Sequence, residues 1–324
     1  MMPDIPPPPE SASVPLESVV NSIRSNAKSV QTARNYVDTM NAVARVCAGS
    51  MLGHALVRDC QTTFEALKHA SSNLKPITLK NRITGIMGAF KMCDALKMED
   101  TEDSAWKFWD EIHRDMLAAA RVSAQTNIAS PSQIDNMVTL EQILAAARSL
   151  THDTVKQSQD KVLMTLAALV PAKRADWARL RIVDLQDAVD KDENGLVVSP
   201  TAMTLVLNVY KTARAYGRHV EEINGEPADV IRTSLATHPR AFLFVSPARP
   251  GGMSNDAFQT YFSGTFDRHM RKHVTINLLR HIWVTERIDP RRMTVLEMDE
   301  VARKMLHGLG TQRMYFLVTP PHEG

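Results

Sequence analysis

The chain has 324 residues, and its 38 Lys and Arg against 36 Asp and Glu leave a net charge of +2. Apolar residues make up 44% and charged residues 23%, so most of the chain can fold around a hydrophobic core. The near balance of charge excludes a polycation, so any nucleic-acid-binding face must come from local clusters. Three cysteines, Cys47, Cys60 and Cys93, are too few for a disulfide framework and favour an intracellular setting.

Neither a membrane span nor a secretion signal is predicted. The longest apolar run, residues 162–170, is interrupted by Thr165 and is too short to cross a bilayer. Residues 1–13 are rich in Pro and Ser and lack the basic start and apolar core of a signal peptide. We expect them to be a disordered tail.

Residues 14–125 are predicted to form an all-helical domain. Apolar residues recur with helical spacing in three stretches, at 29–47, 79–93 and 106–117. Ser29 is a candidate N-cap for the first of these helices. No strand is predicted in this part of the chain.

Charge is distributed unevenly in this domain. Residues 14–97 carry 11 basic and 5 acidic side chains, whereas residues 98–115 carry 2 basic and 7 acidic ones. The pattern indicates either an ordinary solvated surface or a basic face that binds phosphates.

The polar segment 126–138 contains a central Ser-Pro and is predicted to be a linker. It leads to a second domain, residues 139–324, which begins with a capping box formed by Thr139 and Gln142. Further helices are expected at 155–170, 254–272, 275–287 and 294–307, the last of them opened by a capping box of Thr294 and Glu297.

The second domain also contains the only convincing β region. The segments 196–199, 202–211 and 217–223 are short and rich in β-branched residues, and Asn194-Gly195 is predicted to form a tight turn before them. Residues 241–245 are either a buried strand or a loop. The fold class is therefore mainly α: an all-helical domain followed by a mixed α+β domain with a small antiparallel sheet.

Several kinds of site are excluded. The sequence has no P-loop, no G-x-G-x-x-G after a strand, no H-E-x-x-H and no G-x-S-x-G. Its Cys and His spacings do not match a structural zinc site. No metal and no cofactor are predicted.

The second domain does contain an ordered series of cations, an imidazole and a tyrosine. Arg174 follows a helix and precedes Asp176, Lys211 ends a strand, Arg280 lies in TINLLRHIW, and ARKMLHGLGTQRMYF brings His307 and Tyr315. Each has an ordinary interpretation when taken alone, such as an ion pair, a solvated lysine, a helix cap or a packing tyrosine. Taken together, their order along the chain is more specific than any one of them.

In order, spacing and structural context, this series resembles the motifs of the tyrosine recombinase (phage integrase) superfamily. The resemblance covers about residues 160–315, and HGLGTQRMY is most similar to a divergent branch from eukaryotic mobile elements and large DNA viruses. It implies that residues 14–125 are a core-binding domain and residues 139–324 a catalytic domain.

The resemblance also implies catalytic roles. Arg174 and Arg280 would hold the nonbridging oxygens of a DNA phosphate, and His307 would donate a further hydrogen bond to them. Tyr315 would attack the phosphorus to give a 3′-phosphotyrosyl link. Lys211 would protonate the departing 5′-oxygen, so neither metal nor ATP is needed.

Two departures from the family pattern stand out. Asn277 occupies the place of the first His in the H-x-x-R motif, where it can donate a hydrogen bond but cannot transfer a proton. His281 and His273 are candidates to replace that His, although a helix would point His281 away from Arg280. Only nine residues follow Tyr315, too few for the C-terminal helix that family members often exchange within a tetramer.

The predicted function is that of a site-specific recombinase or integrase, with double-stranded DNA as the partner and a homotetramer on DNA. It would act in the cytoplasm of a prokaryote or the nucleus of a eukaryotic host. The alternatives are a type IB topoisomerase-like enzyme and a DNA-binding protein of the same fold that has lost catalysis. The candidate DNA contacts are Lys28, Arg34, Lys80, Arg82, Arg268, Arg271 and Lys272.

Overall fold

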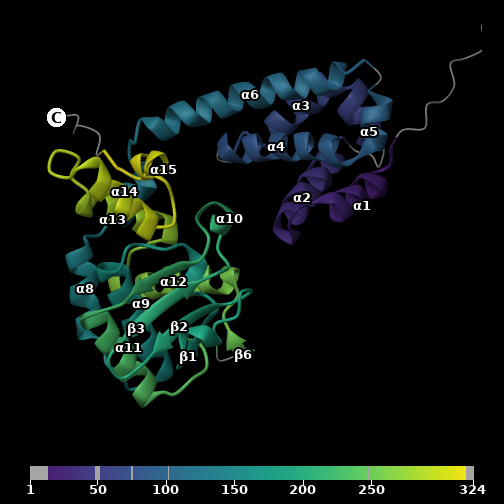
Figure 1. Cartoon of the computed structure of the whole chain (residues 1–324). Helices are drawn as coiled ribbons and strands as arrows, with labels where there is room; N and C mark the ends of the chain where they lie inside the picture. Colours follow the sequence, from purple (N-terminus) through teal and green to yellow (C-terminus); the bar gives the residue numbers. More distant parts are fainter. Residues whose placement is uncertain (1–13, 48–51, 74–75, 101, 247–248, 319–324) are drawn as a thin grey trace, which may run out of the picture. The chain divides into compact units, whose positions relative to one another are not determined.

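The structure, a computed structural model, describes residues 14–47, 52–73, 76–100, 102–246 and 249–318. The predicted tail at residues 1–13 lies outside them. The chain divides after Gln125 into two compact units, which we call the N-terminal unit and the C-terminal unit (Figure 1).

The elements that the structure describes in the N-terminal unit are all helices. Its helices are α1 (Leu16–Asn26), α2 (Val30–Val46), a π-helical turn (His54–Arg58), α3 (Cys60–Ala70), α4 (Pro76–Met92), α5 (Asp94–Glu99) and α6 (Ser104–Gln125). The Ser29 side chain accepts a hydrogen bond from the Thr32 amide at 3.1 Å, which confirms the predicted cap of α2.

The core of this unit forms where α2 and α6 pack against α4. Gly85 and Gly88 permit a close approach of α2, because a Cβ atom on either would lie within 2.5 Å of Thr39 or Tyr36. Trp109 on α6 is fully buried, and its indole donates a hydrogen bond to the Leu56 carbonyl at 2.8 Å. The apolar spacing seen in the sequence therefore corresponds to a packed interior.

The C-terminal unit combines helices with a small sheet (Figure 1). Its helices are α7 (Pro131–Asn136), α8 (Leu140–Ser149), α9 (Val155–Leu169), α10 (Ala213–Tyr216), α11 (Glu226–Thr237), α12 (Asn255–Met270), α13 (Ile276–Arg287), α14 (Val295–Lys304) and α15 (Leu309–Arg313), with 3-10 turns at Ala175–Trp177 and Gln186–Ala188. Its strands are β1 (Leu180–Val183), β2 (Asn194–Val198), β3 (Met203–Leu207), β4 (His219–Glu222), β5 (Val245–Ser246) and β6 (Arg249–Gly252). The capping boxes predicted for α8 and α14 are both present.

The predicted fold class is confirmed, with a correction to the sheet. The strand order is β1-β2-β3-β4, and β1 runs parallel to β2, so the sheet is mixed rather than wholly antiparallel. Residues 241–245 run beside β1, where the Ile182 amide donates to the Ala241 carbonyl at 2.8 Å. A separate two-stranded ribbon is formed by β5 and β6.

The tight turn predicted at Asn194-Gly195 is wrong. Both residues belong to β2 and pair with Leu207 and Val206 of β3. The glycine is needed for a different reason, because a Cβ atom at this position would lie 2.5 Å from the side chain of Val189. The α7 helix likewise occupies part of the segment expected to be a linker, capped by Ser130.

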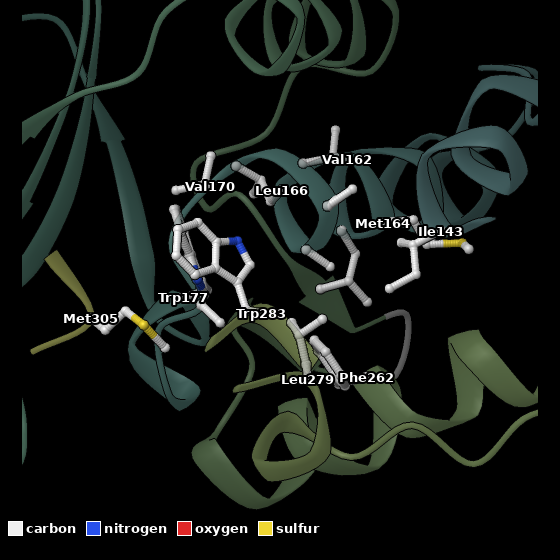
Figure 2. Packing of buried hydrophobic residues seen from close by; sticks show 14 of the residues in the cluster. Ile143, Val162, Met164, Leu166, Val170, Trp177, Phe262, Leu279, Trp283 and Met305 are labelled. Atoms are coloured by element: carbon white, nitrogen blue, oxygen red, sulfur yellow. The ribbon is translucent and has the colours of Figure 1, made fainter. Parts of the chain in front are cut away.

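The core of the C-terminal unit lies around α9, which is buried along most of its length. Figure 2 shows Val162 and Leu166 of this helix and Val170, the residue that follows it, together with the two indoles Trp177 and Trp283. This packing fixes the loop that follows α9, where the candidate site begins. No helix in the described part of the chain is both long enough and apolar enough to traverse a lipid bilayer.

Candidate active site

The loop after α9 carries the first candidate residue, Arg174. It precedes a 3-10 turn, and its amide donates a hydrogen bond to the Asp176 carboxylate at 3.1 Å. Burial raises the pKa of Asp176, although this hydrogen bond and the nearby cations oppose the shift. The carboxyl group of Asp176 therefore helps to fix the conformation of the loop that carries Arg174.

Arg280 on α13 is 1% exposed and joins three segments. Its guanidinium donates to the carbonyls of Ala172 at 2.7 Å and Met305 at 3.1 Å, and to Nδ1 of His307 at 2.6 Å. Its buried Nε–H has no hydrogen-bond partner among the described residues. These contacts hold Arg280 rigidly beside the loop that bears Arg174.

His307 follows α14, which ends at Lys304, three residues earlier than expected. Leu306 takes a left-handed conformation with φ of 61° and turns the chain. Because a guanidinium only donates, Nδ1 of His307 must be the acceptor, so the proton lies on Nε2. That Nε2 is buried and has no hydrogen-bond partner in the described part of the chain.

The electrostatic environment keeps His307 neutral. Burial, reinforced by the charges of Arg280 and Arg174, lowers its pKa to about 3. A neutral imidazole with a free N–H can donate a hydrogen bond to a phosphate oxygen. It would not transfer a proton to that oxygen as a general acid.

Tyr315 lies among these groups. Its ring stacks on the His307 ring with centroids 5.3 Å apart, and the Arg280 guanidinium carbon lies 4.8 Å from its centroid. Burial alone would raise the pKa of the phenol, but the charges and hydrogen bonds of Arg280 and Arg174 together lower it. The phenol oxygen therefore sits next to both candidate phosphate-binding guanidiniums and is easier to deprotonate than an ordinary tyrosine.

Lys211 and Asn277 are placed less directly. Lys211 is exposed in the connection between β3 and β4, and its neighbour Thr212 donates a hydrogen bond to the Leu306 carbonyl at 2.9 Å. This ties the lysine-bearing connection to the loop of His307. Asn277 is exposed, one helical turn before Arg280.

The two histidines considered as replacements for the missing His, His281 and His273, lie in different surroundings. The His281 ring lies 4.9 Å from the Tyr315 ring, and its Nδ1 lies 2.9 Å from the Tyr315 carbonyl oxygen. The turn at Tyr315 brings the tyrosine across the side of α13, so adjacent residues Arg280 and His281 both reach it. His273 is exposed and pairs with Asp267 at 3.0 Å.

The segment after Tyr315 forms hydrogen bonds with other parts of the C-terminal unit. The Leu317 amide donates to Thr285 on α13 at 3.0 Å. Val318 pairs with the strand-like segment 127–129, donating to the Asn127 carbonyl at 2.7 Å and accepting from the Ala129 amide at 3.1 Å. The described part of this segment is extended.

The candidate DNA contacts fall into two groups. Arg82, Arg268 and Lys272 are engaged within the protein: Arg82 donates to Ser71 at 2.7 Å, Arg268 pairs with buried Asp160 at 3.1 Å, and Lys272 donates to the Asp135 carbonyl at 2.5 Å. The others are the exposed Lys28, Arg34 and Arg271 and the half-buried Lys80. DNA contact stays a prediction for all seven.

A search of the described residues finds no group of three or more His, Cys, Asp or Glu side chains that could hold a metal ion. The buried cluster next to Tyr315 instead consists of cations and neutral donors, which suit an anion.

No protein-family model matches the sequence, and no curated protein matches it. Solved structures do match the fold. The post-cleavage complex of the XerH site-specific recombinase bound to palindromic difH substrate covers 95% of this chain and 94% of its own, with 13% identity and a TM-score of 0.52. The pre-cleavage complex of XerH bound to difH substrate covers 95% of each chain, with 12% identity and a TM-score of 0.51. The chain therefore has the tyrosine recombinase fold.

Proposed function

We propose that this protein is a site-specific DNA recombinase or integrase that cuts and rejoins duplex DNA through a 3′-phosphotyrosyl intermediate. The observation that carries the proposal is the position of Tyr315, whose ring stacks on the neutral His307 imidazole and lies 4.8 Å from the Arg280 guanidinium carbon. The charges of Arg280 and Arg174 also lower the pKa of its phenol. The fold shared with XerH bound to its DNA substrate supports the same conclusion.

In the proposed reaction, the Tyr315 oxygen attacks the phosphorus of one backbone phosphate. The phenol loses its proton to solvent, a bond from its oxygen to phosphorus forms, and the bond from phosphorus to the 5′-oxygen breaks. Arg174 and Arg280 would neutralise the charge that builds on the nonbridging oxygens, and the free Nε2–H of His307 would donate to one of them. These groups make the reaction independent of ATP, because the phosphotyrosyl ester conserves the energy of the broken bond.

Lys211 would supply the proton that the departing 5′-oxygen requires. The hydrogen bond from Thr212 to Leu306 holds its connection next to the His307 loop, which supports this assignment. Asn277 faces solvent on the same helix as Arg280 and would contact DNA as a neutral hydrogen-bond donor.

Duplex DNA is the proposed partner, held by phosphate contacts from both units. Recombination requires two strands to be cut on each of two duplexes, so we propose a homotetramer on DNA. The exposed cations Lys28 and Arg34 in the N-terminal unit and Arg271 in the C-terminal unit are the best-placed of the predicted contacts.

The test uses a pool of random-sequence duplexes that carry a nick, because the target sequence is unknown. Cleavage near the nick releases a short 5′-hydroxyl strand and traps the covalent complex, which survives denaturation. We expect the full chain to retain DNA covalently and Tyr315→Phe to retain none while still shifting DNA in a native gel. DNA binding without any covalent product in the wild type would instead favour the DNA-binding protein that has lost catalysis.

Relaxation of supercoiled plasmid separates the remaining alternative. A topoisomerase-like enzyme would relax plasmid without exchanging strands, whereas a recombinase joins ends from two duplexes. Sequencing of the trapped DNA identifies a preferred site, and a substrate pair carrying that site then reports strand exchange directly.

A further inference from the structure

Lys173, next to Arg174, is buried in a way that the proposed reaction does not use. Its side chain is 0% exposed and pairs with the Glu221 carboxylate at 2.5 Å. A lysine is almost never fully buried unless it is paired. Its ammonium also donates to the Lys304 carbonyl, the last residue of α14.

Each partner of this ammonium belongs to a segment with a proposed catalytic residue. Lys173 itself begins the loop of Arg174. Glu221 lies on β4, in the hairpin whose connection carries Lys211. The Lys304 carbonyl ends α14, three residues before His307. We call these stretches the three catalytic segments.

The Lys173 ammonium interacts strongly with both of its partners, the Glu221 carboxylate and the Lys304 carbonyl. The C-terminal end of a helix carries partial negative charge, so the α14 carbonyl and the Glu221 carboxylate both attract a cation. Glu221 is held in turn by Nε2 of His219 at 3.1 Å. Burial lowers the pKa of Lys173, and the Glu221 charge opposes that shift. No apolar side chain of similar length can make two directed hydrogen bonds to two segments.

We infer that Lys173 is a positioning residue, which fixes the three catalytic segments relative to one another through its single ammonium. This inference rests on the proposed function. Lys173 touches neither the phenol nor the phosphate in this scheme and acts only through the groups that it holds.

The first test is Lys173→Met, which keeps the length of the side chain and removes the charge. Trapping of covalent DNA at saturating DNA should slow roughly tenfold to 100-fold, because a displacement of about 1 Å in a catalytic constellation has effects of that size. DNA affinity should stay unchanged. A loss confined to affinity would overturn the inference.

The matched control is Arg240→Met. Arg240 is another largely buried cation of the same unit, and its guanidinium donates to the carbonyls of Ser234, His238 and Leu243, none of which lies in a catalytic segment. We expect it to lower the melting temperature without slowing covalent trapping below that temperature. Equal slowing in both variants would show a general effect of destabilisation and would overturn the inference.

A double variant guards against a single variant that fails to fold. Lys173→Met with Glu221→Met removes both buried charges, and such exchanges are often neutral or stabilising. The inference requires the melting temperature to recover while covalent trapping stays slow. Recovery of both would mean that only the unpaired charge was harmful and would overturn the inference.

Amide hydrogen exchange provides a readout independent of activity. In the double variant, peptides covering 303–308 and 211–216 should exchange faster than in the wild type, and peptides of α11 should not. Unchanged exchange in both catalytic peptides would overturn the inference. If the wild-type protein traps no DNA at all, the proposed function fails, and exchange still decides whether Lys173 holds these segments.

Discussion

The two units bury different kinds of side chain. Among the described residues of the N-terminal unit, Asp100 is the one buried charged side chain, and it accepts hydrogen bonds from the amides of Ala105 and Trp106 at the start of α6. The C-terminal unit buries Asp160, Lys173 and Arg280 as well as the imidazole of His307. Buried charge is unfavourable unless it is fully paired.

The difference indicates what each interior is for. An apolar interior suffices where the task is to hold a surface in shape, and the N-terminal unit is built in that way. Under the proposed function, the C-terminal unit accepts the desolvation of several ions because a phosphate-binding site needs guanidiniums that do not move. Its polar network would then serve both stability and chemistry.

The largest expected effect on stability comes from Trp109→Ala, which tests whether the N-terminal interior depends on packing alone. The change removes a fully buried indole and one of the two side-chain hydrogen bonds to the Leu56 carbonyl, so we expect a loss of about 3–5 kcal/mol in the free energy of unfolding. Calorimetry should show a lower transition for the N-terminal unit only. An equal shift of the C-terminal transition would break the comparison.

Arg174→Ala tests the opposite case, a large loss of chemistry with little loss of stability. Arg174 is only half-buried, so the free energy of unfolding should change little. Covalent trapping should slow roughly 100- to 1,000-fold, the effect of removing one preorganised donor to a developing oxyanion. Arg174→Lys keeps the charge but loses the planar fork and should recover only part of the rate. An unchanged rate in Arg174→Ala would refute the role of this guanidinium.

Gly85→Ala sharpens the comparison on a smaller scale. The added methyl group meets Thr39 across the contact of α2 and α4, and overpacking of this kind costs about 1–3 kcal/mol. The matched control is Gly310→Ala on α15, where an added Cβ atom has no neighbour within 4 Å. Denaturant titration should show destabilisation in the first variant alone. Equal effects would mean that α2 and α4 do not need this close approach.

The last prediction concerns acid stability. The pKa of His307 is lowered to about 3 in the folded protein, below its ordinary value of 6.5. The unfolded chain therefore binds a proton through pH 6.5 and the folded protein does not, so stability falls as the pH drops from 6.5 towards 3. His307→Asn cannot titrate and should lose less stability between neutral pH and about pH 4.5. The same loss in both proteins, measured by urea titration, would contradict a neutral buried imidazole.

The helices and the tyrosine motif could be predicted from the sequence because each depends on local pattern. The apolar spacing of α2, α4 and α6 and the caps at Ser29, Thr139 and Thr294 are properties of a few neighbouring residues. The order of the motif residues is likewise a property of the sequence itself, and it favoured the fold that the solved structures share.

What could not be predicted depends on contacts between distant segments. Strand β1 is parallel to β2, and no turn in the sequence announces such a pairing. Asn194-Gly195 has the composition of a turn, but the glycine serves the approach of Val189. The burial of Lys173 could not be predicted either, because nothing nearby in sequence shows that Glu221 and the end of α14 enclose it.

The pairing of Val318 with residues 127–129 places the start of the C-terminal unit beside the segment that follows Tyr315. Residues 127–129 thereby stabilise the position of the segment that carries Tyr315. A fragment that begins at Thr139, the first predicted residue of the second domain, would lack residues 127–129. The segment that carries Tyr315 would then be held less firmly. Anyone excising this half as an independent tool should make the cut before Asn127.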